Sequence, residues 1–320
     1  MSDVTPPLYP WLYESANLLS AQHVIGRLHH ALLFHGSEGL GKGALAEIIA
    51  TGLLCFERHD LTHCGQCKSC LLVKAGNHPD LLSLEGSDKA LGINDIRQIN
   101  QFVEQMPLIA KRKVVVIKGL DKMTLEATNG LLKSMEEPNQ HSYLLMCTNQ
   151  IEKLLPTIVS RCFKMTISAF DRQQVFAWLG QTGVDVSVPQ LARLYRLADE
   201  APLKLLAFIE QDKVQTFLNL EQKFAQWQQG KLSLVAFKAD VSDDDFALTT
   251  LRFLLHEQLK QQLTKDSAGD DFRLVSEIIA QLTAFSRDGE QIIGQNKGLA
   301  LIRMLNQIDS AWHGGKFVDS

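Results

Sequence analysis

A glycine-rich segment at residues 36–43 has the composition of a loop that holds phosphate groups. Gly36, Gly39 and Gly41 are followed directly by Lys42. Glycines let backbone N–H groups turn towards an anion, and a lysine at the start of the next helix adds positive charge. The spacing predicts a P-loop, with these three glycines and Lys42 as candidate phosphate-binding residues. A glycine turn without a function is the alternative.

The groups that nucleotide hydrolysis would need are missing around this loop. The residue after Lys42 is Gly43, where a Ser or Thr hydroxyl would bind Mg²⁺. The apolar run at 114–117 is followed by Lys118 and Gly119. A metal-binding acid and a glutamate that activates water would be expected at those two positions. Three losses in one mechanism predict no intrinsic ATPase activity, but they leave weak nucleotide binding open.

Four of the six cysteines lie close together, at Cys55, Cys64, Cys67 and Cys70. No secretion signal is visible, so disulfides are disfavoured and the spacing predicts a metal site. Four thiolates fill a tetrahedral shell, which is typical of structural rather than catalytic zinc. Such a site would hold together a polar segment that has little apolar surface of its own. Free reduced cysteines and a redox Cys-x-x-Cys pair are the alternatives.

Alternating strands and helices must position these residues. We expect a short apolar strand over 27–36 and a helix over 43–56, on either side of the glycine loop. The four β-branched residues at 114–117 indicate a strand covered on both faces, as in a parallel sheet. Further elements complete an α/β domain: strands at 81–84, 142–147 and 163–167, and helices at 93–105 and from Thr124 to before Pro138.

After residue 169 the pattern becomes helical. Apolar residues at helical spacing predict helices over 171–180, 188–198 and 202–210, and the chain from 213 onwards also reads as helices. The predicted fold is therefore α/β followed by all-α. We expect three domains: 1–168 with the cysteine module at 55–70, a small helical domain at 169–211, and a larger helical domain at 212–320.

The composition is that of an ordinary globular protein, with 45% hydrophobic and 21% charged residues among 320. It excludes a disordered chain, a collagen and a coiled-coil rod. No uncharged run approaches the roughly 18–20 residues of a membrane span, and we expect a cytoplasmic protein. A net charge of −4 and an aromatic content of 7% argue against a zinc-dependent nucleic-acid-binding module.

Taken together, these features resemble the clamp-loader branch of the AAA+ proteins. The helical remainder of the chain agrees with this family in length and class, without a sharp motif. Six segments between residue 9 and about residue 167 carry the resemblance: Tyr9-Pro10-Trp11-Leu12, the glycine loop, the cysteine cluster, Gly76-Asn77-His78-Pro79-Asp80, the run Asn-Gly-Leu-Leu-Lys-Ser-Met-Glu-Glu-Pro at 129–138, and Leu-Pro-Thr-Ile-Val-Ser-Arg-Cys at 155–162.

The resemblance implies a RecA-like AAA+ P-loop domain with a zinc-binding insertion, a small helical lid and a C-terminal helical collar. It also implies a place in a heteropentamer of bacterial DNA polymerase III, beside motor (tau/gamma) and delta subunits. That complex places the beta sliding clamp on primed DNA, and this chain would reach both through the assembled ring. A non-catalytic, stator-like subunit fits the missing groups. The alternative, an ATP-hydrolysing motor subunit, would need Thr or Ser at 43 and Asp-Glu at 118–119.

The same resemblance gives a role to Arg161 in Ser160-Arg161-Cys162. Without it, this arginine would be read as a surface residue or as part of a salt bridge at a strand edge. In the clamp-loader family, the arginine of this segment is donated to the nucleotide site of a neighbouring subunit, where it stabilises charge on the γ-phosphate. Asn149 stands at the family's sensor 1 position. Leu203, with Lys204 beside it, stands where a sensor 2 arginine belongs.

Overall fold

The chain divides into two compact units. The first comprises Met1–Val188 and Ala198–Leu206, and the second comprises Pro189–Leu197 and Ala207–Ser320. Within the described residues, no helix is both long enough and apolar enough to cross a membrane. The computed structural model describes residues 8–58, 60–86, 90–136, 138–169, 171–184, 188–239, 241, 245–265, 305–306 and 308–309.

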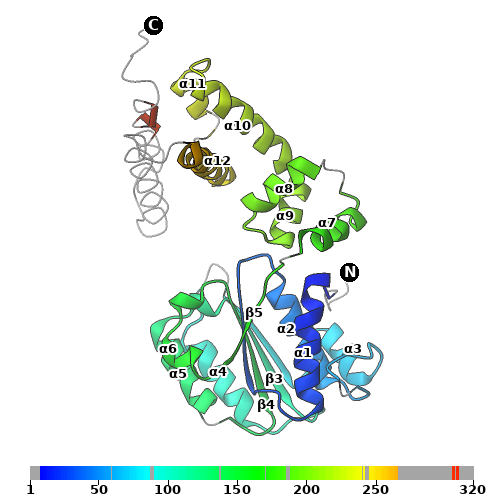
Figure 1. Cartoon of the computed structure of the whole chain (residues 1–320). Helices are drawn as coiled ribbons and strands as arrows, with labels where there is room; N and C mark the ends of the chain where they lie inside the picture. The colour runs from blue at the N-terminus through cyan, green and yellow to red at the C-terminus, as the bar shows by residue number, and fades with distance from the viewer. Residues whose placement is uncertain are drawn as a thin grey trace. The chain divides into compact units, whose positions relative to one another are not determined.

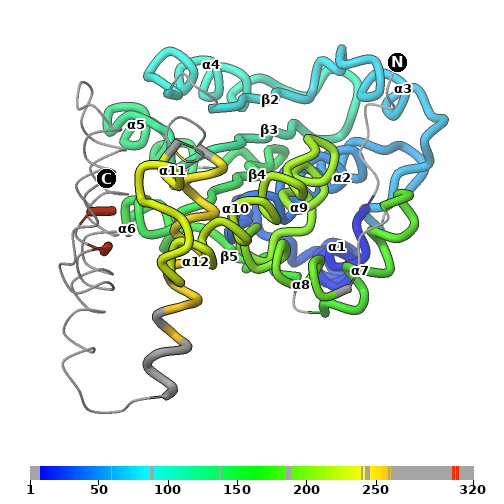
Figure 2. The backbone as a smooth tube through the Cα atoms, turned by 90° about the horizontal axis from the view of Figure 1, so that it is seen from above, coloured from blue at the N-terminus to red at the C-terminus, as the bar shows by residue number. Residues whose placement is uncertain are grey.

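A five-stranded parallel sheet forms the centre of the first unit, in the order β2-β3-β4-β1-β5. Figure 2 follows the strands from β2 at one edge to β5 at the other. β3 lies inside the sheet and is buried along almost its whole length, as its β-branched run predicts. The expected parallel sheet is confirmed. Its strands are β1 (Ala31–His35), β2 (Leu81–Glu85), β3 (Lys113–Lys118), β4 (Ser142–Thr148) and β5 (Phe163–Thr166).

Helices cover both faces of this sheet (Figure 1). α4, α5 and α6 share one apolar cluster with β3 residues such as Val115 and Ile117. The helix predicted over 93–105 is present as α4, whose Ile96, Ile99 and Val103 are buried. In Figure 1, α1, α2 and α3 lie on the other side of the sheet. The bounds of the helices are η1 (Pro10–Leu12), α1 (Tyr13–Val24), α2 (Lys42–Leu54), α3 (Lys68–Lys74), α4 (Ile93–Glu104), η2 (Leu120–Lys122), α5 (Leu125–Glu136), η3 (Ile151–Lys153), α6 (Pro156–Val159) and α7 (Arg172–Gln181).

The regular elements described in the second unit are all helices. Its core is rich in aromatic side chains, and the rings of Trp227 and Phe237 stack with centroids 4.9 Å apart. Trp227 Nε1 also donates to Asp309 at 2.6 Å. The unit contains α8 (Val188–Leu197) from Pro189 onward, α10 (Lys213–Gln228), α11 (Leu234–Ala239) and α12 (Asp245–Lys265).

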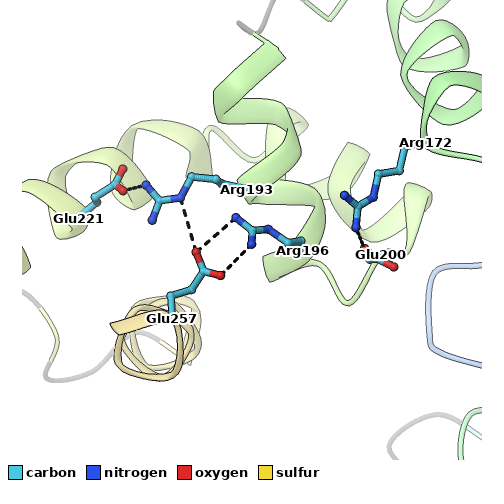
Figure 3. Close-up of polar contacts among 6 residues, drawn as sticks. All are labelled: Arg172, Arg193, Arg196, Glu200, Glu221 and Glu257. Carbon is cyan, nitrogen blue, oxygen red and sulfur yellow. Dashed lines mark hydrogen bonds and ion pairs between the residues drawn. The ribbon is translucent and has the colours of Figure 1, made fainter. Parts of the chain in front are cut away.

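Two arginines of α8 join this helix to α10 and α12 (Figure 3). Arg196 contacts both carboxylate oxygens of Glu257 in α12, at 2.9 and 3.3 Å, and Arg193 pairs with Glu221 of α10. α8 is therefore grouped with the C-terminal unit, whereas α9 (Pro202–Glu210) is divided after Leu206. The helices predicted over 171–180, 188–198 and 202–210 are present, and the chain from 213 to 265 is mainly helical. The rest of the prediction, for 266–304 and 310–320, lies outside the described residues. The division into domains at 169–211 and 212–320 stays a prediction.

Candidate functional site

The glycine loop folds as predicted, between strand β1 and helix α2. Gly36, Gly39 and Gly41 have φ angles of +144°, +84° and +82°, which residues with a side chain rarely adopt. Lys42 opens α2, and its Nζ donates to the carbonyl oxygens of Gly36 at 2.8 Å and Ser37 at 2.7 Å. The side chain is 6% exposed, and this burial lowers the pKa of Lys42. The Lys42 side chain therefore links the start of α2 to the backbone of the glycine loop.

The N-terminal aromatic segment lies directly on this loop. A Cβ added to Gly41 would stand 2.8 Å from the ring of Tyr9. Trp11 Nε1 donates to the Leu40 carbonyl oxygen at 2.9 Å, and the rings of Tyr9 and Trp11 stack with centroids 5.0 Å apart. The residue types of this segment resemble those of the family, but they carry no local signal for its contact with the loop.

The start of α9 covers the loop from a second segment of the same unit. The Leu203 N–H donates to the Gly39 carbonyl oxygen at 3.0 Å. A Cβ added to Gly39 would stand 2.9 Å from Lys204 Cβ, so a side chain at this position would crowd α9. Lys204 Nζ pairs with Asp199 at 2.6 Å. Leu203, which the resemblance places at sensor 2, thus contacts the loop through its backbone N–H.

Lys118, at the end of β3, lies beside Gly43 at the start of α2. A Cβ added to Gly43 would stand 3.2 Å from Lys118 Cε and 3.4 Å from its Cδ. Lys118 Nζ pairs with Glu47 of α2 at 2.5 Å and lies 4.0 Å from Glu85. Burial alone would lower the pKa of Lys118, but the hydrogen bond and charge of Glu47 outweigh it and raise the pKa. With an ammonium group in place of a metal-binding acid, these residues do not fit Mg²⁺.

The positions after Lys118 are also unsuited to metal-dependent hydrolysis. Gly119 has a φ of +74°, and a Cβ there would stand 2.7 Å from the Gly86 carbonyl oxygen, so a glutamate would be strained. Asp121 accepts hydrogen bonds from Thr148 Oγ1 at 2.8 Å and from the Asn149 N–H at 3.0 Å. The Asp121 carboxylate therefore fixes the end of β4, and Asn149, which the resemblance places at sensor 1, contributes its backbone N–H to that contact.

The four clustered cysteines come together in space. Their Sγ atoms all lie within 4.8 Å of one another, with Cys55 and Cys67 4.0 Å apart and Cys64 and Cys70 3.9 Å apart. Cys67 caps the N-terminus of α3, and Cys70 lies in its first turn. Backbone N–H groups lower the pKa of Cys64 to about 6, and the thiolate is the form that binds metals. The cluster is able to bind a metal ion.

A buried polar network holds the cysteine segment in place. Ser69 Oγ donates to the Leu54 carbonyl oxygen at 2.6 Å and lies 2.9 Å from His78 Nε2. His78 Nδ1 accepts from the Asp80 N–H at 3.0 Å, so Nε2 carries the proton of the neutral ring. Burial lowers the pKa of His78, although the charge of Asp80 opposes this. In the sequence, His78 and Asp80 appear only within the family segment at 76–80, and no local pattern indicates their role.

Serine, histidine and aspartate in this network do not form a catalytic triad. The Asp80 carboxylate accepts the N–H groups of Leu108, Ile109 and Ala110 at 2.7 to 2.8 Å, and Lys113 Nζ lies 3.8 Å away. Burial would raise the pKa of Asp80, but these donors and Lys113 outweigh it and lower the pKa. The carboxylate anchors the loop before β3 and does not orient the histidine.

Arg161 is partly exposed and is held at two points. Its Nη1 donates to the Thr157 carbonyl oxygen of α6 at 3.0 Å, and its Nη2 pairs with Glu136 Oε1, at the end of α5, at 2.6 Å. The side chain of Arg161 is 37% exposed and that of Glu136 is 50% exposed. The guanidinium is thus ordered within its own chain and accessible from outside it.

Comparisons with known proteins show that this chain is similar to subunits of DNA polymerase III. The family model described as DNA polymerase III, delta subunit, matches residues 13–171. A DNA polymerase III subunit delta' of Pseudomonas aeruginosa is 36% identical over 200 residues, which is 61% of this chain and 60% of that protein. A DNA polymerase III subunit tau/gamma of Haemophilus influenzae is 29% identical over 284 residues, which is 83% of this chain and 40% of that protein.

A search of solved structures also found a protein with a distantly similar fold. A DNA polymerase III gamma subunit-related protein from Thermotoga maritima superposes with a TM-score of 0.47 at 17% identity, covering 92% of this chain and 98% of that chain. The present chain spans about 60% of the length of the curated delta' relatives it matches first.

Proposed function

Because this chain belongs to the DNA polymerase III subunit family that includes the delta' proteins, we propose that it is a non-catalytic, stator-like subunit of the clamp loader. In this role it assembles with motor (tau/gamma) and delta subunits. The complex places the beta sliding clamp on primed DNA in the cytoplasm, and this chain contributes to that step without hydrolysing ATP itself.

The contact of Lys118 with Glu47 beside Gly43 carries this proposal. Nucleotide-hydrolysing P-loops depend on Mg²⁺, which bridges the phosphates and neutralises developing charge. Here the ammonium group lies 2.5 Å from Glu47, and its side chain fills the space next to Gly43. Lys42 is bound to carbonyl oxygens of its own loop. We call the glycine loop closed because Lys42 and Lys118 both bind groups of this chain at the place where a nucleotide and its metal would bind. These contacts support a loop that performs no chemistry.

An ATP-hydrolysing motor subunit is the second candidate. The identity of 29% to a tau/gamma protein favours it over an unrelated function. A motor subunit needs a hydroxyl at position 43 and acidic residues at 118 and 119, and this chain has Gly43, Lys118 and Gly119 there. The strain that a side chain would meet at Gly119 argues further against this candidate.

We assign zinc, in a structural role, to the cysteine cluster. Tetrahedral zinc with Zn–S bonds of about 2.3 Å holds its sulfur ligands roughly 3.8 Å apart. The separations of 3.9 and 4.0 Å agree with that value, whereas a disulfide needs about 2.05 Å. Four thiolates leave no open coordination position, so the metal would stabilise the segment at 55–70 and would not catalyse a reaction.

Arg161 is our candidate for a residue that acts in the nucleotide site of a neighbouring subunit. An arginine delivered by a partner stabilises charge on the transferred phosphoryl group and raises turnover by about 10³–10⁵ in other NTPases. The partial exposure of Arg161 supports such a role, because the guanidinium is reachable from outside the chain. The chain would then complete a catalytic site without containing one.

We assign the two helical regions to the remaining parts of the proposed subunit. The Leu203–Gly39 hydrogen bond supports a lid function for the region at 169–211, because it brings the start of α9 onto the glycine loop. We assign the region at 212–320 to the oligomerisation collar. Its described helices bury an aromatic core of their own, as an assembly domain requires.

Clamp loading by a reconstituted complex tests this function. Motor, delta and the present chain are mixed with beta clamp and primed DNA, and the loaded clamps are counted. We expect loading to require this chain and to be unchanged by Lys42→Ala, since the glycine loop performs no chemistry. Equal loading without the chain would contradict the proposal. So would loss of loading with Lys42→Ala in a complex that still assembles.

A further inference from the structure

Two contacts orient the guanidinium of Arg161 before any partner is present. Thr157 O lies 3.0 Å from Nη1, and Glu136 Oε1 lies 2.6 Å from Nη2. Thr157 belongs to α6, and Glu136 is the last residue of α5. Both helices pack into the apolar cluster beneath the sheet, through residues such as Met135 and Ile158. The two anchors of the guanidinium therefore sit on packed elements rather than on a free loop.

These contacts leave much of the guanidinium available. A guanidinium has five N–H donors, and the two contacts use one donor on each terminal nitrogen. Three donors remain for the oxygens of a ligand. The side chains of Arg161 and Glu136 are 37% and 50% exposed, so a ligand in solvent can reach the guanidinium. Arg161 can therefore bind a phosphate while Glu136 stays in place.

We propose that Glu136 is a positioning residue for Arg161. It holds the arginine in the orientation in which the guanidinium meets the terminal phosphate of a nucleotide bound to a neighbouring subunit. This inference rests on the proposed role of Arg161. A free arginine samples many rotamers, and contacts made in advance reduce the ordering that the transition state requires. Glu136 acts through Arg161 and touches no nucleotide.

ATP turnover by the reconstituted loader, with clamp and primed DNA present, tests this inference. We expect Glu136→Ala to lower kcat about fivefold at an unchanged KM for ATP, because an exposed ion pair orients its arginine modestly and the arginine acts in the transition state. Glu136→Gln keeps an acceptor oxygen and is expected to lose less. Glu126→Gln, an exposed glutamate in the first turn of the same helix, is the matched control and should leave kcat unchanged.

The same substitutions in an Arg161→Ala background separate positioning from a structural effect. There, Glu136→Ala should lower turnover no further. An equal loss in both backgrounds, no loss in either, or a rise in turnover from Glu136→Ala alone would each overturn the inference. If Arg161→Ala itself has no effect in an intact complex, the proposed role of Arg161 fails and the inference fails with it. If the loader with Arg161→Ala is inactive and the loader with Glu136→Ala is fully active, the positioning role of Glu136 is wrong and the proposed role of Arg161 stands.

Discussion

Replacement of Gly43 by threonine tests the closed state of the glycine loop. A Cβ at this position would stand 3.2 Å from Lys118 Cε and 3.4 Å from Lys118 Cδ, and threonine adds two more heavy atoms. Lys118 must then move, which weakens its ion pair with Glu47. We therefore expect Gly43→Thr to lower the free energy of unfolding of the first unit, and we expect Lys118→Ala to relieve this loss.

The magnitude follows from three contributions. Crowding of a packed site costs about 1–3 kcal/mol, and the lower end applies because the neighbour is the flexible end of a lysine. The ion pair adds less than about 1 kcal/mol, since Lys118 and Glu47 are 26% and 33% exposed. Threonine recovers roughly 0.5 kcal/mol as a better helix former than glycine. Gly43→Thr should thus cost about 1 kcal/mol in the wild-type background and be neutral or slightly stabilising with Lys118→Ala, a coupling of about 1.5 kcal/mol.

Hydrogen exchange of the β3 and β4 amides measures the opening free energy of this unit without assuming that the whole chain unfolds in one step. The four proteins of the double-mutant cycle are compared. Gly180→Thr in α7 is the matched control, because an added Cβ there meets nothing within 4 Å. A coupling below about 0.5 kcal/mol would refute the claim that Lys118 fills the space beside Gly43. A Mg²⁺-dependent stabilisation of the wild-type protein by ATP would contradict the closed loop itself.

Three further predictions concern the cysteine segment. Cys67→Ser should remove the bound zinc, measured by atomic absorption, whereas Cys162→Ser, outside the cluster, should retain it; equal zinc content in both would exclude the assigned ligands. Gly52→Ala should also weaken zinc retention against a chelator, because its Cβ would stand 2.0 Å from the Leu61 carbonyl oxygen and push the segment away; unchanged retention would show that this contact is not required. Because burial lowers the pKa of His78 in the folded state, the neutral ring contributes stability above its unfolded pKa of about 6.5, and this contribution is lost as the pH falls further. Melting curves between pH 8 and pH 5 should therefore show a smaller loss of stability on acidification for His78→Asn than for wild type, and equal slopes would contradict this assignment.

Local patterns were sufficient to predict the α/β half of the fold. The β-branched run at 114–117 forms the inner strand β3, and the helix predicted over 93–105 is present as α4. The glycine loop and the cysteine cluster were predictable for the same reason, since their residues are close in sequence and their spacing is the signal.

Contacts between distant residues could not be predicted from one sequence. In the sequence, Gly43 indicates only that a metal-binding hydroxyl is missing. That Gly43 also leaves space for the Lys118 side chain depends on the packing of α2 against the end of β3. Arg196 and Glu257 are 61 positions apart, so the grouping of α8 with the C-terminal unit had no local signal. The Arg161–Glu136 pair likewise depends on how α5 and α6 pack.

The central proposal is that this chain completes a partner's catalytic site while having none of its own. The decisive measurement is ATP turnover by the loader rebuilt with motor and delta subunits, with clamp and primed DNA present, carrying Arg161→Ala. Arg97→Ala, an exposed arginine of α4, is the control, and gel filtration verifies assembly. We predict a loss approaching about 10³-fold at the site that Arg161 completes, with assembly intact and the control unaffected. Unchanged turnover in an intact complex would contradict the proposed action of Arg161 in a partner's nucleotide site.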